Sequence, residues 1–192
     1  MLKGGQIELN NCIQGAFAKA AATTSASFEL LDYEDFSADS ANYVFTPSSA
    51  LTADNYSQFL IVITGKTDAV NALPTIIFSD SASNVYAVGA TIEANGDRTS
   101  LTVSNSAPIN IGNATTFPSA NRNFTCLISV TINPLLAYIT GYMQTFNGDN
   151  IFSEQKWFEV SATDIDKVEI EMTSTGKFKA DTRFAMYGLK TT

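Results

Sequence analysis

Acidic side chains carry most of the reactive chemistry in this sequence. The chain has 192 residues, of which 19 are Asp or Glu and none is His. Without histidine the chain lacks Ser-His and Cys-His nucleophile pairs, imidazole zinc ligands and the commonest general base at neutral pH. A pair of carboxylates, as in glycosidases, remains the enzymatic alternative. The candidate carboxylates are Asp32, Glu34, Asp35, Asp54, Glu154 and Glu159.

No recognisable motif surrounds these carboxylates, so we predict that they are solvated side chains and that the protein is not an enzyme. Asp164 and Asp166, together with the acidic run Asp32–Asp35, could form a calcium site. Calcium takes six or more oxygen ligands, however, and the EF-hand spacing is absent. The Walker phosphate-binding pattern is absent as well. The sequence therefore predicts no catalytic residue, no metal site and no cofactor.

Composition indicates what kind of scaffold positions these side chains. Apolar residues make up 45% of the chain and aromatic residues 11%, which is enough for a buried core. Charged residues make up only 16%, and much of the remaining polarity comes from Ser, Thr and Asn, which suit strands and turns better than helices. We predict one ordered, β-rich domain. The aromatic content exceeds what a core of this size must use.

Short apolar runs recur from Phe28 onward, separated by turn residues such as Asn95-Gly96-Asp97 and Asn147-Gly148-Asp149. The predicted strands are Phe28–Leu31, Asn42–Thr46, Tyr56–Gly65, Leu73–Phe78, Val85–Ile92, Ser100–Ser104, Phe124–Ile132, Leu135–Phe146, Lys156–Val160, Lys167–Thr173 and Thr182–Leu189. The longest predicted loop is Asn105–Asn123. Many short strands with polar turns are typical of a sandwich, so the predicted fold is all-β, a jelly-roll β-sandwich.

The C-terminal segment carries the clearest strand pattern. In its first run, apolar side chains alternate with Glu169 and Glu171, which we expect to face water. In its second run, Phe184 and Met186 occupy one face. The Gly-centred turn Thr175-Gly176-Lys177 lies between the two runs, so we predict that they form a hairpin.

Residues Gly176-Lys177-Phe178-Lys179-Ala180, followed by a strand that ends in Tyr187-Gly188-Leu189, resemble the C-terminal signature of a family of small jelly-roll proteins in the virions of tailed bacteriophages. Tyr56–Gly65 is similar to the central strand of that family, and Trp157–Val160 lies where the family often has a Trp. Asp181 departs from the pattern, because the family usually has Gly there. The resemblance is close over residues 150–190 and loose over residues 28–192.

This resemblance implies a non-enzymatic virion structural protein, first of all a decoration or cement protein that stabilises the capsid through subunit contacts. Jelly-roll virion proteins of this kind commonly form trimers, so a homotrimer is expected. The expected partners are sister subunits and the major capsid protein or another virion protein. The alternative is a receptor-binding fibre or tail-tip domain that recognises host glycans.

Net charge restricts the partners further. The formal charge is −8, and the 11 basic residues are scattered along the chain. Because nucleic-acid binding needs clustered Lys and Arg, and anionic membranes repel an acidic protein, we expect neither as a partner. No apolar run approaches the ~20 residues of a membrane span, and polar residues stand where a signal peptide needs an apolar core. The expected location is the virion, after synthesis in the host cytoplasm.

Residues 1–27 differ in composition from residues 28–192, which we assign to the jelly-roll domain. The segment ends in a Thr- and Ser-rich linker and is too interrupted by Gly and Asn to form a stable isolated helix. We predict a short N-terminal arm that contacts another subunit or the shell, with the first strand of the sandwich as the alternative. The predicted interface residues are Leu2, Ile7, Leu9, Ile13 and Phe17.

The chain contains two cysteines, Cys12 and Cys126. In a chain well supplied with apolar residues, such cysteines behave as small buried hydrophobic side chains. A disulfide between them is the alternative.

Overall fold

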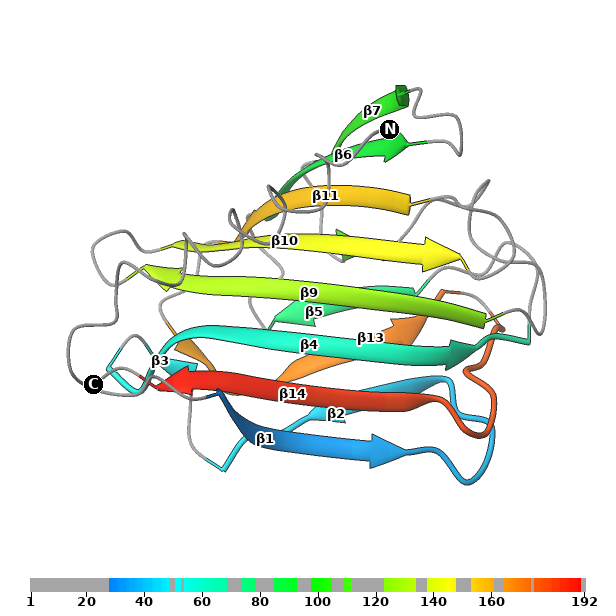
Figure 1. Cartoon of the computed structure of the whole chain (residues 1–192), viewed down its shortest axis with the longest axis horizontal. Coiled ribbons are helices and arrows are strands. Elements are labelled where there is room, and N and C mark those ends of the chain that lie inside the picture. The colour runs from blue at the N-terminus through cyan, green and yellow to red at the C-terminus, as the bar shows by residue number, and fades with distance from the viewer. Residues whose placement is uncertain are drawn as a thin grey trace, which may run out of the picture.

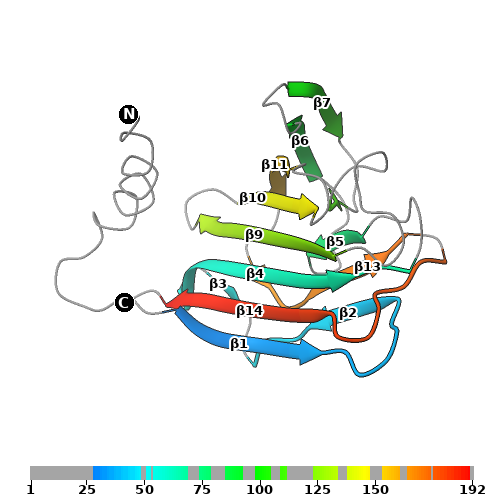
Figure 2. The same ribbon diagram turned by 45° about the vertical axis from the view of Figure 1, so that its right-hand side comes forward.

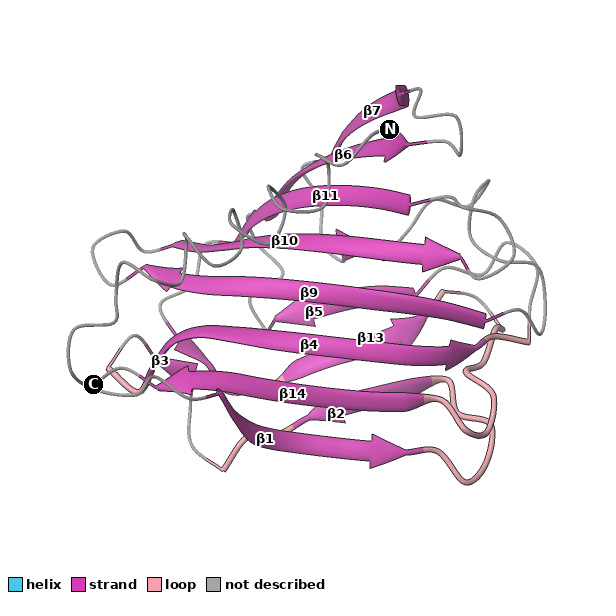
Figure 3. Ribbon diagram, viewed as in Figure 1, coloured by secondary structure: helices cyan, strands magenta, loops and turns pink. Residues whose placement is uncertain are grey.

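The computed structural model describes residues 28–48, 51–52, 54–68, 74–78, 85–92, 98–104, 109–111, 123–133, 138–147, 153–160, 164–173 and 175–190. Strands are the only regular elements within these ranges (Figure 3). Their bounds are β1 Phe28–Asp35, β2 Asn42–Phe45, β3 Leu51–Thr52, β4 Tyr56–Lys66, β5 Pro74–Phe78, β6 Val85–Ile92, β7 Arg98–Ser104, β8 Ile109–Asn110, β9 Asn123–Asn133, β10 Tyr138–Asn147, β11 Ser153–Val160, β12 Asp164–Ile165, β13 Val168–Met172 and β14 Arg183–Lys190.

Two antiparallel sheets form the body of the protein (Figure 1). The large sheet has the strand order β1-β14-β4-β9-β10-β11-β6-β7, and the small sheet has the order β2-β13-β5-β8. Figure 2 shows β2, β13 and β5 behind the large sheet. Strands β12 and β3 form a separate pair. The predicted all-β sandwich is therefore confirmed.

Each predicted strand overlaps an observed strand, and β6 has the predicted bounds. The observed β1 is longer than predicted, because it continues through an acidic stretch to Asp35. The structure also contains β3, β8 and β12, which were not predicted. Each of these strands is 2 residues long. Strand β8 lies within the predicted loop Asn105–Asn123. Strands this short show no periodicity that a sequence could reveal.

The prediction of a C-terminal hairpin is wrong. Strand β13 pairs with β2 and β5 in the small sheet, whereas β14 pairs with β1 and β4 in the large sheet. Phe178, on the connection between them, is fully buried and forms isolated backbone bridges with Ser40 and Thr67. Its ring lies edge-on to Phe184, with the ring centroids 5.2 Å apart. A large apolar side chain in the connection therefore favours a crossing between the sheets over a tight turn.

The core lies between the sheets and follows the two-residue period of the strands. In β4, Phe59, Ile61 and Ile63 are buried. Across the core, β13 buries its apolar residues, while Glu169 and Glu171 are more exposed, as predicted. Burying each large apolar side chain contributes about 1.5–3 kcal/mol, so these alternating rows are the main source of stability.

Cys126 in β9 is one of the buried core residues. The Thr145 hydroxyl donates a hydrogen bond to its sulfur, with the two atoms 3.6 Å apart. The predicted role of a small buried side chain is confirmed for Cys126. The alternative of a disulfide involves Cys12, which lies outside the described residues.

Thr67 is a fully buried side chain whose hydroxyl has no hydrogen-bond partner among the described residues. An unmet buried hydroxyl costs about 1–3 kcal/mol, because the group has lost its bonds to water. We expect Thr67→Val, which keeps the shape of the side chain, to raise the free energy of unfolding by about 1 kcal/mol in a urea titration.

The matched control for this substitution is Thr75→Val. The Thr75 hydroxyl is also buried but donates to the Glu171 carbonyl at 3.3 Å, so its removal should lower the free energy of unfolding. A loss of stability in Thr67→Val would contradict the prediction, because it would mean that the hydroxyl has a partner.

Asp181 has a φ of 67°, a left-handed conformation that residues with a Cβ adopt at a cost. Its amide donates to the Phe36 carbonyl at 2.7 Å, which holds this turn against the core. Glycine is the residue that suits such a position. We expect Asp181→Gly to be at least as stable as the parent protein and Asp181→Ala to be about 1 kcal/mol less stable than Asp181→Gly. Thermal unfolding measures the difference, and equal melting temperatures for the Gly and Ala variants would refute it.

Candidate interaction surface

The predicted interface residues Leu2, Ile7, Leu9, Ile13 and Phe17 lie outside the described residues, as does the whole predicted arm. Their contacts therefore stay a prediction. Several of the candidate carboxylates lie on described strands. Another candidate surface, which does not involve the predicted arm, lies on the large sheet.

Asp32 joins the edges of the two sheets. It lies in β1, the edge strand of the large sheet, directly after a register shift that follows Leu30. One of its carboxylate oxygens accepts a hydrogen bond from the Tyr43 hydroxyl at 2.9 Å, and the other accepts one from the Thr46 amide at 3.0 Å. Burial, and then the bond to Asp32, raise the pKa of Tyr43. A carboxylate that bonds in this way to β2 and its following residue is a structural group.

Two further carboxylates of β1 are tied to neighbouring strands. Asp35 accepts a hydrogen bond from Nε of Arg183 in β14 at 3.1 Å. Glu29 accepts one from the Tyr56 hydroxyl and pairs with Nζ of Lys190 at 2.8 Å. The bond from Lys190 and then that from Tyr56 lower the pKa of Glu29. In return, the bond to Glu29, together with burial, raises the pKa of Tyr56 to about 12.

The remaining candidate carboxylates with described side chains are exposed: Glu34, Asp54, Glu159 and Asp166. This exposure agrees with the prediction of solvated side chains for Glu34, Asp54 and Glu159, whereas Asp32 and Asp35 bond to other parts of the chain. The side chains of Glu154 and Asp164 are not among those described. In the part of the chain that the structure describes, no group of 3 or more His, Cys, Asp or Glu residues could hold a metal ion. The same part contains no helix long and apolar enough to cross a membrane.

The face of the large sheet that points away from the core is mostly uncharged over β1, β14, β4, β9 and β10; the charged residues in its rows are Asp35 and Arg183, which pair with each other. The backbone register aligns Leu30, Tyr187, Leu60, Ser129 and Tyr142 in one row across these strands. With the neighbouring rows they form what we call the outer face: Phe28, Leu30, Tyr33, Gln58, Leu60, Val62, Thr64, Thr125, Leu127, Ser129, Thr131, Thr140, Tyr142, Gln144, Phe146, Ala185, Tyr187 and Leu189.

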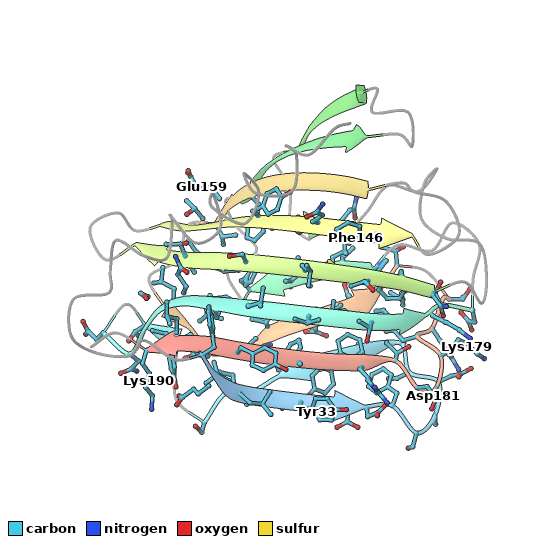
Figure 4. All side chains as sticks on the ribbon, viewed as in Figure 1. Tyr33, Phe146, Glu159, Lys179, Asp181 and Lys190 are labelled. Atoms are coloured by element: carbon cyan, nitrogen blue, oxygen red, sulfur yellow. The ribbon has the colours of Figure 1, made fainter. Side chains whose placement is uncertain are left out.

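The large apolar side chains that are exposed in the described structure all belong to the outer face. Phe28 is 45% exposed, Leu30 57%, Tyr33 49% and Phe146 40%. Figure 4 shows Tyr33 on β1 and Phe146 on β10, at opposite margins of the face. Three of these four residues lie together on β1, and exposed apolar side chains grouped in this way make the outer face a candidate for contact with another molecule.

Sequence reasoning did not predict where this surface lies. Its signal is present in β4, where Phe59, Ile61 and Ile63 point inward while Leu60 and Val62 point outward. A search for alternation finds only one buried face, because it treats the opposite residues as polar. The excess of aromatic residues over the needs of the core indicates a contact surface but not its position.

Comparisons with known proteins do not identify the chain. No protein-family model matches it, and no curated protein matches it. Among solved structures, the VP2 subviral particle of infectious bursal disease virus aligns with 88% of this chain and 43% of that chain, at 12% sequence identity and a TM-score of 0.15. The chain thus corresponds to less than half of that chain. A similarity at this level carries no argument about fold or function.

Two carboxyl groups with lowered pKa values make stability depend on pH. Glu29 is one, and the other is Asp39, whose pKa is lowered by bonds from Lys179, at 2.6 Å, and from the Ala180 amide. A carboxyl group whose pKa falls on folding stabilises the folded state above its unfolded pKa, and this contribution is lost as the pH falls through the folded pKa. We therefore expect the melting temperature to fall as the pH drops below 4.5, the ordinary pKa of Glu.

Calorimetry across this range should assign part of the decrease to Glu29. The Glu29→Gln variant lacks the titrating group, so its melting temperature should fall less than that of the parent protein. Lys190→Gln removes the partner at 2.8 Å and should reduce the decrease in the same direction. If the melting temperature of Glu29→Gln fell with pH as much as that of the parent protein, the Glu29–Lys190 pair would not contribute to the decrease.

Proposed function

We propose that this chain is a non-enzymatic structural protein of a tailed-phage virion, and specifically a decoration or cement protein of the capsid. In this proposal the sandwich strands are connected as a jelly roll and the protein forms a homotrimer. Its partners are sister subunits and the major capsid protein or another virion protein. Its work is mechanical, because each contact ties neighbouring subunits together and symmetry repeats the contact over the shell.

The observation that carries this proposal is the outer face. A sheet face with few charged residues and with exposed Phe28, Leu30, Tyr33 and Phe146 has the composition of a protein contact surface. The carboxylates of β1, by contrast, bond to other parts of the chain through Glu29, Asp32 and Asp35, as expected of structural groups. Function through binding is therefore better supported than function through chemistry.

The residues that resemble the phage family have clear structural roles, which supports using the resemblance. Phe178 of the Gly-x-Phe-x-Ala stretch is fully buried. Gly188 of the terminal Tyr-Gly-Leu lies against Tyr56, where an added Cβ would be 2.6 Å from Cδ1 of that ring and 2.8 Å from Cδ1 of Leu31. Only glycine fits so close to another side chain, so both motif positions meet demands of packing.

A receptor-binding domain that recognises host glycans is the second candidate, and the aromatic rings of the outer face favour it. Tyr33, Tyr142 and Tyr187 could stack on sugar rings. Gln58 and Gln144 lie on the same face and could bond to sugar hydroxyls. Binding to a glycan array that is lost in Tyr33→Ala would favour this candidate.

The location of the protein in purified particles distinguishes the two functions. For a decoration protein, we expect immunogold labelling over the whole shell and many copies per particle by quantitative mass spectrometry. Labelling confined to the tail would favour the receptor-binding function. Absence from particles would refute both.

Deleting residues 1–22 tests the predicted arm. If the segment is an arm, the truncated protein should keep a cooperative melt and lose binding to bare capsids or sister subunits. Each apolar side chain buried at such a contact is worth about 1.5–3 kcal/mol at most, so several are needed to hold an arm in place. A truncated protein that unfolds would identify the segment as the first strand. Normal decoration by the truncated protein would mean that attachment lies elsewhere.

A further inference from the structure

We propose that the outer face of the large sheet is covered by a second copy of this chain. This inference deepens the proposed function, because it names the surface through which subunits associate. It rests on three features of the described residues, namely the distribution of charge, the state of the β1 edge and the extent of the face.

Charge favours a second copy at this face over any other surface of the sheet. Each chain carries a formal charge of −8, so two copies repel each other wherever their carboxylates meet. Among the rows of the outer face, only the row of Thr64, Thr125 and Phe146 contains charged residues, namely Asp35 and Arg183. These two form an ion pair with each other at 3.1 Å, so their charges are neutralised within the chain. Two like-charged chains can therefore approach here without bringing unpaired carboxylates together.

The edge of the large sheet at β1 is protected against pairing with another strand. A register shift between Leu30 and Asp32 distorts the strand. Asp32 and Glu34 align with the core-facing Met186 and Phe184, so β1 carries carboxylates on its inner side. Bulges and inward-pointing charges are the features that prevent one sheet edge from joining another. A second copy therefore meets the face of the sheet rather than its edge.

The outer face is large enough to hold a subunit. It spans 5 adjacent strands of the large sheet and the length of β1. With strands ~4.8 Å apart and a rise of ~3.3 Å per residue, its flat footprint is about 500 Å². This footprint is of the same order as the ~800 Å² that each partner contributes to a typical stable interface.

Light scattering on the purified full-length protein, without virions or glycans, tests this inference. We expect the parent protein to be oligomeric at micromolar concentration. Leu30→Lys and Phe146→Lys place charges at opposite margins of the face, at positions that are 57% and 40% exposed, so the core should be undisturbed. Each should weaken self-association at least about 100-fold, because the interface would then bury an unpaired charge, which is strongly unfavourable.

The matched control is Glu34→Gln, which changes the net charge by the same amount from the other side of the same strand. It should keep the parental mass, and unchanged melts would confirm that all three variants fold. A dimer or a trimer would support the proposal if the lysine variants dissociate it. A parent protein that stays monomeric, or an oligomer that survives both lysine substitutions, would overturn it. The virion-labelling experiment is independent of this result, so the two proposals can fail separately.

Discussion

Strand β4 has apolar residues on both of its faces, and its register determines which of them face the core and which face outward. Pairing with β14 and β9 turns Phe59, Ile61 and Ile63 toward the small sheet and leaves Leu60 and Val62 on the other side. A shift by one residue would exchange the two sets. Whichever set is inside, an apolar row remains outside, and the strands on either side of β4 extend it. The outer face therefore follows from the apolar residues on both sides of β4.

At the edge and the end of the sandwich, single residues make the contacts that join its segments. Asp32 bonds the β1 edge to Tyr43 in β2, and Phe178 fills the end where the chain crosses from one sheet to the other. Gly188 lets β14 pass close to Tyr56. Each of these contacts joins segments that are distant in sequence. They satisfy the edge and the end from within the chain, which leaves the outer face of the large sheet as the surface that we propose for contact with other molecules.

The strands could be predicted because their signals are local. Alternation, β-branched residues and turn residues are visible within a few positions, and every predicted strand overlaps an observed one. The pairing of strands is not local, and the prediction of a C-terminal hairpin was wrong for that reason. The residues around Gly176 have the composition of a hairpin turn, but Phe178 is buried between the sheets, and β13 and β14 belong to different sheets. The role of Asp32 was hidden as well, since its partners Tyr43 and Thr46 become neighbours only when the sheets stack.

The place of β14 in the large sheet has a consequence for how the chain is made. This last strand lies between β1 and β4, and its Leu189 pairs with Phe28 at the other end of the described chain. The ribosome makes β14 after β1 and β4, so neither of them can pair with this common neighbour until the strands between have been made. During that time each has an unpaired edge that can recruit strands from other nascent chains. Closing contacts so distant in sequence is also slow. Chains that terminate before β14 should therefore aggregate rather than accumulate as shortened domains.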